Sequence, residues 1–213
     1  MVRNWTAVIP VKRLGLAKTR LRGAVPMDRH PDLALAMVRD TAAAVLAAAT
    51  VAELIVVTDD PVVGDAVREL GARVVPDPGG GLNSAMRFGA DEAAGLSAHR
   101  AVLAGDLPAL RPEQLDDALS RVSGRSFVAD AAGTGTVLLA VPPGQVLDPR
   151  FGGLSAAAHA GSGAARLRGD WPGLRQDVDT AADLGAVLAL GAGRRTCGLL
   201  RDLGLTAECA PAA

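Results

Sequence analysis

The sequence predicts an α/β protein, built as one domain around a mostly parallel β-sheet with helices on both faces. Short apolar segments rich in β-branched residues alternate with longer segments of helical pattern along the first half of the chain. This alternation is typical of parallel sheets covered on both sides. The 213 residues suffice for one domain with a full core. No linker or repeat divides them, so we expect one domain over residues 1–206 and a flexible tail over residues 207–213.

The first half of the chain carries the regular part of this pattern. The apolar, β-branched segment WTAVIPV, residues 5–11, is expected to form the first buried strand. Further strands are expected at 53–58, 73–76 and 100–104, and helices at 31–49, 61–70, 82–98 and 112–122. Gly71 follows the second of these helices, where glycine commonly ends a helix.

The alternation changes in the second half. Two strands are expected at 126–130 and 136–141 with no helix between them. A loop is expected at 148–155, a short strand near 176–179 and a helix at 180–190. We therefore expect this half to form the less regular side of the sheet.

Composition and charge exclude several classes of function. The net charge of −1 gives no electrostatic basis for binding nucleic acid or an anionic membrane, and aromatic residues, at 2%, are too few for base-stacking platforms. No apolar stretch has the length of a membrane span and no signal sequence is evident, so we expect a cytoplasmic protein. Cys197 and Cys209 form no CxxC motif, and we expect both thiols to be reduced.

A basic loop follows the first expected strand. Residues 1–27 contain six basic residues and no acidic one, and both lysines of the chain, Lys12 and Lys18, lie there. Loops at the carboxyl ends of parallel strands are where α/β proteins bind ligands, and clustered positive charge suits a triphosphate. Such runs are usually solvated surface, but the position after the first strand favours an anion site. The loop lacks the Walker-type P-loop pattern.

A glycine-rich loop, DPGGGLN, follows the third expected strand. Its three successive glycines expose backbone amides and allow a phosphate or a flat ring to approach closely. The amide of Asn83 both donates and accepts hydrogen bonds, so it is able to read the edge of a base. The alternative interpretation is an ordinary loop in which Asn83 caps the next helix.

Three aspartates are candidates for a metal site. Asp106 follows the fourth expected strand, and Asp177 and Asp179 stand two residues apart in the segment DVDT. Residues two apart on a strand point to the same side, so these two carboxylates are expected to converge. Like charges that close need a cation or a raised pKa, and Mg²⁺ prefers a few carboxylates with phosphate oxygens and water. Helix capping by Asp179 or Thr180 explains only one of the two aspartates.

Two further loops, GTGT at 133–136 and RFGGLS at 150–155, carry glycines and hydroxyl-bearing residues. Such loops suit an anionic substrate, because hydroxyls and backbone amides bind anions without adding charge. An ordinary hairpin turn is the alternative interpretation of GTGT.

Together these motifs resemble the GT-A-like nucleotidyltransferases, and more narrowly the guanylyltransferases of coenzyme F420 biosynthesis. The segments IPVKRLGLAKTRL, GGGLN, AGDLP, GTGT, RFG–S and DVDT occur here in the order seen in that family. The resemblance implies a single-domain, Rossmann-like (GT-A-like) fold and a divalent metal. RFGGLS departs from the family's pattern, where a polar or proline-containing insert is expected, and this leaves the shape of the acid pocket open.

The resemblance also implies roles for individual residues. The carboxylates that would bind two Mg²⁺ ions are Asp106, Asp177 and Asp179. The contacts to the small acid would be Thr136, Gly152 and Ser155, with Thr134 open as the alternative to Thr136. The contacts to GTP would be Lys12, Lys18, Arg20, Gly80 and Asn83, and Lys18 would also take part in catalysis.

The reaction implied by the resemblance transfers GMP from GTP to phosphoenolpyruvate, giving enolpyruvoyl-2-diphospho-5'-guanosine and pyrophosphate. The acceptor phosphate is already anionic, so positioning and charge neutralisation suffice without a general base. Alternative acceptors are 2-phospho-L-lactate, a sugar phosphate and molybdopterin. Outside enzymes, the alternative is a nucleotide-sensing domain, against which three converging carboxylates argue. A homo-oligomer, or a downstream transferase of the same pathway, stays open as a protein partner.

Overall fold

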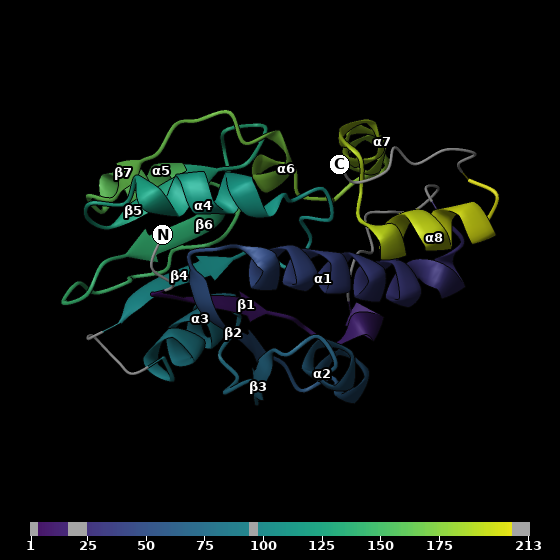
Figure 1. Ribbon diagram of the computed structural model, residues 1–213, viewed down its shortest axis with the longest axis horizontal. Coiled ribbons are helices and arrows are strands. Elements are labelled where there is room, and N and C mark those ends of the chain that lie inside the picture. Colours follow the sequence, from purple (N-terminus) through teal and green to yellow (C-terminus); the bar gives the residue numbers. More distant parts are fainter. Residues whose placement is uncertain (1–3, 17–24, 94–97, 206–213) are drawn as a thin grey trace.

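The computed structural model describes residues 4–16, 25–93 and 98–205, and it has the expected α/β architecture (Figure 1). Seven strands of the described chain form one sheet in the order β3-β2-β1-β4-β6-β5-β7. Their bounds are Trp5–Pro10 (β1), Val51–Val57 (β2), Arg73–Val75 (β3), His99–Leu103 (β4), Ser126–Ala129 (β5), Thr136–Val141 (β6) and Ala165–Arg166 (β7). Strand β6 pairs antiparallel with β4 and β5, and the remaining pairs are parallel.

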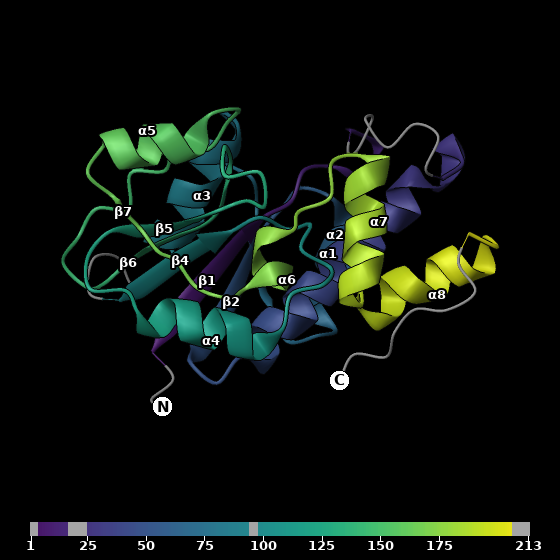
Figure 2. The same ribbon diagram turned by 90° about the horizontal axis from the view of Figure 1, so that it is seen from above.

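Helices cover both faces of this sheet. The α-helices are His30–Ala47 (α1), Pro61–Arg68 (α2), Leu82–Asp91 (α3), Pro112–Ser120 (α4), Ser155–Gly161 (α5), Pro172–Arg175 (α6), Ala181–Leu190 (α7) and Arg194–Asp202 (α8). Short 3₁₀ helices span Leu14–Leu16 (η1) and Met27–Arg29 (η3). Figure 2 shows α3 and α5 on one side of the sheet and α4 on the other.

Alternate residues of the central strands pack into two different cores, as the two-residue period of a strand requires. Ile9 of β1 joins Val38 of α1 and Leu115 of α4 in one core. Its neighbour Val8 joins Met86 of α3 in the other core. All of these side chains are buried. The central strands therefore present apolar side chains to both faces of the sheet.

A third core lies where α7 and α8 pack beside α1. Met37 of α1, Val187 of α7 and Leu200 of α8 are buried together in it. Val178, from the segment DVDT, belongs to the same core and is fully buried. This core therefore anchors the segment that carries two of the candidate metal ligands.

The antiparallel β6 shapes one edge of the sheet. The parallel strands β1, β4 and β5 end at this edge, whereas β6 begins there. The pairing of Leu103 with Leu138, and the hydrogen bond from Ala104 N to Val137 O at 2.9 Å, fix the start of β6 beside the end of β4. The turn between β5 and β6 therefore reaches the same edge as the loops that follow β1 and β4.

Several details differ from the sequence-based expectations. Residues 176–179 are not a strand, because Val178 packs into the third core and no strand of the described residues pairs with them. The helix expected to reach residue 98 ends at Asp91, and Arg73 Nη2 donates to the carbonyl of Glu92 just beyond it at 2.7 Å. Cys197 is disulfide-bonded rather than reduced. The tail expected at residues 207–213 lies outside the described residues.

Four elements of the second half were not expected at all: α5, β7, α6 and α8. Strand β7 has two residues and α6 has four, which is too short for a periodic pattern to show. Helix α5 reads SAAAHAG, where small residues hide the difference between a buried and an exposed face. These elements depend on tertiary packing more than on local pattern.

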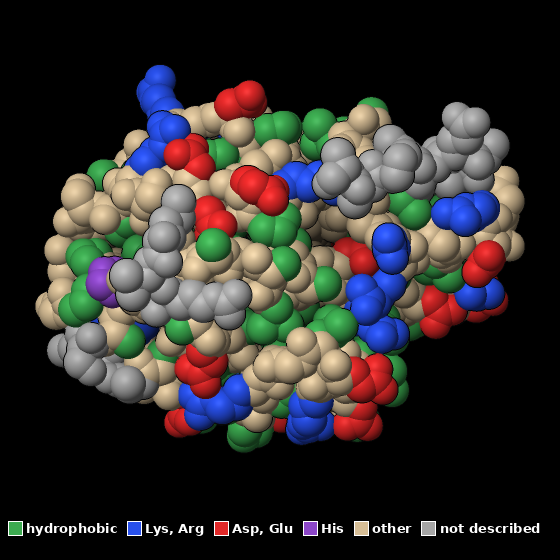
Figure 3. Space-filling model, viewed as in Figure 1, with side chains coloured by type: hydrophobic (Ala, Val, Ile, Leu, Met, Phe, Trp, Pro, Cys, Tyr) green, Lys and Arg blue, Asp and Glu red, His purple; other side chains and the backbone are tan. Residues whose placement is uncertain are grey.

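Charges of both signs are interspersed on the face of the molecule shown in Figure 3. Exposed ion pairs agree with this picture: Arg68 Nη1 lies 2.8 Å from Asp65 Oδ1, and Arg73 Nε lies 2.9 Å from Glu53 Oε1. The described residues of this face therefore form no broad basic surface of the kind that nucleic acid requires. Within the described chain, no helix combines the length and apolarity that crossing a membrane would take.

Candidate active site

The loop after β1 lies at the edge of the sheet where β1, β4 and β5 end. The structure describes the first part of this loop. Lys12 directly follows the buried Val11 and is exposed. Lys18 and Arg20 lie outside the described residues. The backbone N–H of Leu14 donates to Asp60 Oδ2 at 2.9 Å, which ties this loop to the start of α2. The charge of Lys12 is thus presented from a loop with a defined anchor.

Asp60 has a second role in the same place. It is the N-cap of α2, where Pro61 is the first residue, and Oδ1 accepts from the N–H groups of Val62 and Val63 at 3.0 and 3.2 Å. Burial alone would raise the pKa of Asp60, but the hydrogen bonds from Leu14, Val63 and Val62 outweigh it and hold the pKa below its usual value of 3.8. The carboxylate therefore stays charged and holds loop and helix together.

The glycine-rich loop has the backbone conformation that its sequence suggests. Gly79, Gly80 and Gly81 have φ angles of +77°, +80° and +90°, a region that residues with a Cβ rarely adopt. Asp77 Oδ1 accepts from the N–H of Gly79 at 2.8 Å, and Asp59 Oδ1 accepts from the N–H of Asp77 at 3.1 Å. Two carboxylates thus fix a loop that three left-handed glycines shape.

Asn83 does not cap α3, because Gly81 is the N-cap residue and Asn83 lies in the first turn. Its side chain reaches across to the loop before α5 instead. Oδ1 accepts from the N–H of Phe151 at 2.7 Å and Nδ2 donates to the carbonyl of Phe151 at 3.0 Å. Each polar atom keeps one further hydrogen or lone pair, so this pairing is compatible with a contact to a base.

The structure brings the three predicted metal ligands into electrostatic contact. Burial, followed by the charges of Asp106, Asp179 and Asp130, raises the pKa of Asp177 from 3.8 to about 7. Carboxylates that crowd in this way are stabilised by a cation between them. Among the described residues, no three acidic, histidine or cysteine side chains already stand in a coordinating arrangement. The donor set fits Mg²⁺ shared with phosphate oxygens and water, and not a closed cage.

Asp130 belongs to this group although its motif was not singled out from the sequence. It directly follows β5, and its carboxylate accepts from the N–H groups of Thr134 at 2.9 Å and Gly135 at 2.8 Å. A side chain at Gly135 would collide with this carboxylate, which explains the glycine. An aspartate at the end of an expected strand was the available signal.

The segment DVDT is held from both ends, even though it is no strand. Thr180, and not Asp179, is the N-cap of α7, in a capping box with Asp183. On the other side, Arg175 Nε donates to the carbonyl of Ala129 at 3.1 Å and Nη2 donates to that of Asp130 at 2.8 Å. Capping therefore leaves Asp177 and Asp179 for another role, and Arg175 holds their segment against the end of β5.

The residues expected to contact the acid lie in two loops that join each other. The N–H of Ala156 donates to the carbonyl of Thr134 at 3.0 Å, and that of Ser155 donates to the carbonyl of Gly152 at 3.1 Å. Thr136 and Ser155 are buried, with 8% and 3% of their surface exposed, whereas Thr134 is exposed. The turn before β6 and the start of α5 thus form one structural unit beside the acidic group.

His159 of α5 is the central residue of this unit, and the sequence contains no motif that indicates it. The ring is fully buried. Nδ1 lies 2.9 Å from Oγ1 of Thr136, and Nε2 lies 2.9 Å from the backbone N of Arg150. The rings of Phe151 and Phe127 pack against it, with centroids 5.1 and 5.7 Å away.

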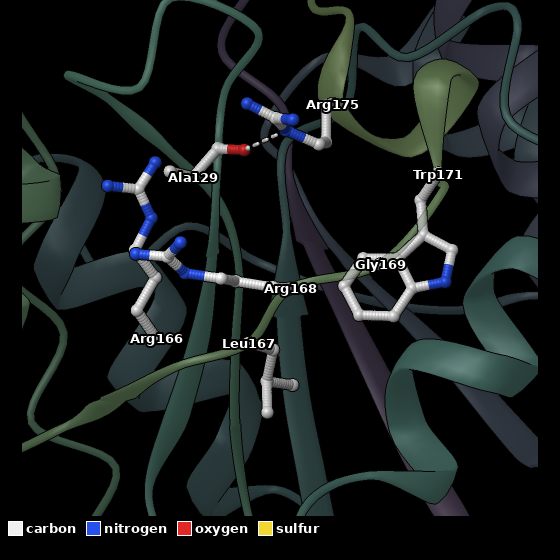
Figure 4. A pocket seen from close by; sticks show the side chains of 7 residues that line it. All are labelled: Ala129, Arg166, Leu167, Arg168, Gly169, Trp171 and Arg175. Atoms are coloured by element: carbon white, nitrogen blue, oxygen red, sulfur yellow. Dashed lines mark hydrogen bonds between the residues drawn. The ribbon is translucent and has the colours of Figure 1, made fainter.

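A cavity of about 270 Å³ lies at the outer strands, beside this edge (Figure 4). Its lining consists of Ala129, Arg166, Leu167, Arg168, Gly169, Trp171 and Arg175. Figure 4 shows Arg175 hydrogen-bonded to Ala129, with Arg166 and Arg168 on the opposite side. Among the described residues, none of the site residues expected from the sequence lines this cavity, although Ala129 directly precedes Asp130.

Comparisons with known proteins indicate the family to which this chain is similar. Residues 5–212 match the model of a family described as guanylyl transferase, CofC-like. A phosphoenolpyruvate guanylyltransferase from Salinispora arenicola is 58% identical over 201 residues, covering 92% of this chain and 93% of the relative. Another, from Streptomyces coelicolor, is 50% identical over 206 residues, covering 94% and 97%.

Solved structures show the same fold at low sequence identity. A protein from Desulfovibrio desulfuricans, described as a nucleotide-diphospho-sugar transferase, superposes with a TM-score of 0.73 at 18% identity, covering 96% of this chain and 97% of the other. A nucleotidyl transferase from Methanothermobacter gives a TM-score of 0.55 at 20% identity, covering 94% and 99%. This chain therefore shares its fold with these proteins.

Proposed function

This chain belongs to the CofC-like guanylyl transferase family, and we propose on that basis that it transfers GMP from GTP to phosphoenolpyruvate. The product is enolpyruvoyl-2-diphospho-5'-guanosine, an intermediate of coenzyme F420 biosynthesis. The names of the relatives support this acceptor. Each is called a phosphoenolpyruvate guanylyltransferase, and this chain matches each over nearly the relative's whole length.

In this reaction, a phosphate oxygen of the acceptor attacks the α-phosphorus of GTP in line. The bond from the α-phosphorus to the bridging oxygen breaks, and pyrophosphate leaves with the electron pair. The attacking oxygen is already anionic, so the protein needs no general base. Its task is to bring two polyanions together and to offset their repulsion.

The observation that supports this proposal most is the crowding of carboxylates around Asp177. Asp106, Asp177 and Asp179 would hold divalent metal, and two Mg²⁺ ions are the expected number. When bound, the metal supplies positive charge at the α-phosphate and at the acceptor phosphate. The raised pKa of Asp177 supports this role, because crowded carboxylates without a cation resist deprotonation.

The nucleotide and the acid would lie on opposite sides of this acidic group. For GTP, we propose contacts from the basic loop and the glycine-rich loop: Lys12, Lys18, Arg20, Gly80 and Asn83. For phosphoenolpyruvate, we propose contacts from the joined loops at β6 and α5: Thr136, Gly152 and Ser155. The three left-handed glycines support the first assignment, because they leave backbone amides open to phosphate.

Release of pyrophosphate is the direct test. The wild-type protein is incubated with GTP and Mg²⁺, and phosphoenolpyruvate, 2-phospho-L-lactate and a sugar phosphate are compared as acceptors. Product mass identifies the joined species, and CTP and ATP in place of GTP measure base preference. The proposal requires fastest turnover with GTP and phosphoenolpyruvate, and faster turnover with 2-phospho-L-lactate would overturn the choice of acid.

A further inference from the structure

The loop before α5, residues 150–155, has little regular structure, yet side chains from outside it bind its backbone at two consecutive residues. The N–H of Arg150 is bound by His159, and both the N–H and the carbonyl of Phe151 are bound by Asn83. We call this segment the acceptor loop. Two separate ties at adjacent residues leave it little freedom to move.

The tie from Asn83 is geometrically specific. The N–H of Phe151 must face an oxygen and its carbonyl must face an N–H, so only one orientation of the amide satisfies both bonds. The partners lie 68 residues apart in the sequence. Asn83 stands two residues after Gly81, so this contact joins the glycine-rich loop directly to the acceptor loop.

The hydrogen bonds of His159 also determine the direction of the Thr136 hydroxyl hydrogen. Nε2 must be unprotonated, because it accepts from the N–H of Arg150. In the neutral ring, Nδ1 then carries the hydrogen and donates to Oγ1 of Thr136. The hydrogen of the Thr136 hydroxyl is consequently directed elsewhere and is available to an anion. Full burial of the ring among Phe127 and Phe151 favours this neutral state.

We infer that Asn83 and His159 are positioning residues for the acid substrate: Asn83 fixes the acceptor loop relative to the nucleotide, and His159 fixes it relative to Thr136. This inference deepens the proposed function and rests on it. Neither side chain has to touch the acid, since each acts through the backbone or hydroxyl that it holds. Loss of His159 should therefore weaken use of the acid more than binding of GTP, whereas loss of Asn83 should weaken both, because Asn83 is also proposed to contact the nucleotide.

Asn83 is tested with Asn83→Ala and Asn83→Asp, in kinetics with phosphoenolpyruvate varied at saturating GTP. We expect KM for phosphoenolpyruvate to rise roughly tenfold in Asn83→Ala, the scale of one or two lost hydrogen bonds. Asn83→Asp should be at least as impaired, because an oxygen then faces the carbonyl of Phe151. A residue that only stabilised the first turn of α3 would give the opposite order, since an aspartate there favours the helix dipole.

His159 is tested with two variants that each keep one bond. The amide of His159→Asn reaches the position of Nδ1 and can keep Thr136, whereas that of His159→Gln reaches the position of Nε2 and can keep Arg150. Each should raise KM for phosphoenolpyruvate about fivefold or more, with GTP affinity changed by less than about threefold. His99→Gln is the matched control: His99 packs on Trp5 at the other end of β4, 4.9 Å between ring centroids.

Amide hydrogen exchange separates this inference from the proposed function, because it needs no substrate. The N–H groups of Arg150 and Phe151 are the donors of the two ties, so Asn83→Ala should speed exchange at Phe151 and His159→Asn should speed it at Arg150, both tenfold or more. Unchanged exchange and unchanged KM in folded variants would overturn the inference. If the wild-type protein does not use phosphoenolpyruvate but the variants show these exchange changes, only the proposed acceptor would be overturned.

Discussion

The two halves of the sheet edge build their loops by different means. On the side of β1, β2 and β3, the glycine-rich loop directly follows β3, and carboxylates no more than 18 residues away in the sequence, Asp59 and Asp77, hold it. On the side of β6, β5 and β7, Asp130 holds the hairpin turn locally, but side chains from other elements hold the acceptor loop and the end of β5. Asn83 and Arg175 bind backbone groups 68 and 46 residues away.

This difference predicts how the loops on each side respond to substitutions elsewhere in the molecule. A loop shaped by its own glycines and local carboxylates keeps its form when distant elements change. A loop held by distant side chains inherits their positions, so its form depends on how α3, α5 and α6 pack. We therefore expect nucleotide binding to be robust and choice of acid to be sensitive to substitutions away from the substrate.

The largest expected effect concerns Asp177, where the two halves meet. Asp177→Asn should lower kcat by on the order of 100-fold or more, because it removes negative charge that would hold the metal. The melting temperature should not fall, since the substitution removes a carboxylate whose pKa is raised to about 7 by burial and by its neighbours. The exposed Asp170→Asn is the control. Near wild-type turnover in Asp177→Asn would show that this carboxylate is no essential ligand.

A smaller effect is expected at Gly80, on the locally built side. Gly80→Ala should destabilise the protein by about 1–2 kcal/mol, because alanine is strained at a φ of +80° and its Cβ would lie 3.2 Å from Oγ of Ser84. GTP titration should show weaker binding, with KM for the acid little changed. Gly185→Ala, inside α7 with no atom near its Cβ, should instead stabilise by roughly 0.5–1 kcal/mol. Urea unfolding of both variants checks the opposite signs.

The smallest expected effect is the pH dependence of stability. It concerns His159, on the side of the site where side chains distant in sequence hold the loops. Burial, only partly offset by Asp148, lowers the pKa of His159 below its usual 6.5. Below about pH 6.5, the unfolded chain then binds a proton at His159 that the folded protein binds only weakly. The stabilising contribution of neutral His159 is therefore present above about pH 6.5 and is lost as pH falls through that value. The contribution is at most about 1.4 kcal/mol per pH unit.

Urea unfolding between pH 7.5 and pH 5 measures this dependence. His159→Gln cannot titrate and should show a flatter profile than the wild type, whereas His99→Gln should keep the wild-type slope. Equal slopes in all three proteins would mean that His159 does not resist protonation in the folded state, and the hydrogen bond from Arg150 would then lose its significance.

The sequence predicted the first half of the molecule well, for a physical reason. Each strand there has a continuous apolar run, and each candidate motif begins where a run ends, so position along the chain indicates position at the sheet edge. Lys12, Gly80 and Asp106 therefore lie where the pattern predicts. Lys18 and Arg20 stay predictions, because they lie outside the described residues.

The second half was harder to predict, because its site depends on contacts between distant residues. Asp177 does interact with Asp106 and Asp179, but in an irregular segment and not in the expected strand. Asp130 could have been noticed as an aspartate at the end of an expected strand. Nothing in the sequence pairs Asn83 with Phe151, and His159 looks like any histidine in an alanine-rich helix.

The reversal of β6 has a consequence for how such a protein can diversify. In a sheet with only parallel strands, the edge where the strands end carries only loops that lead into helices. Here one strand runs the other way, so a hairpin tip, residues 130–135, also reaches that edge. A hairpin tip can be lengthened or exchanged without breaking a strand-to-helix crossover. We therefore expect that exchanging this tip changes the surroundings of Thr136, one of the proposed acid contacts, while the nucleotide half stays intact.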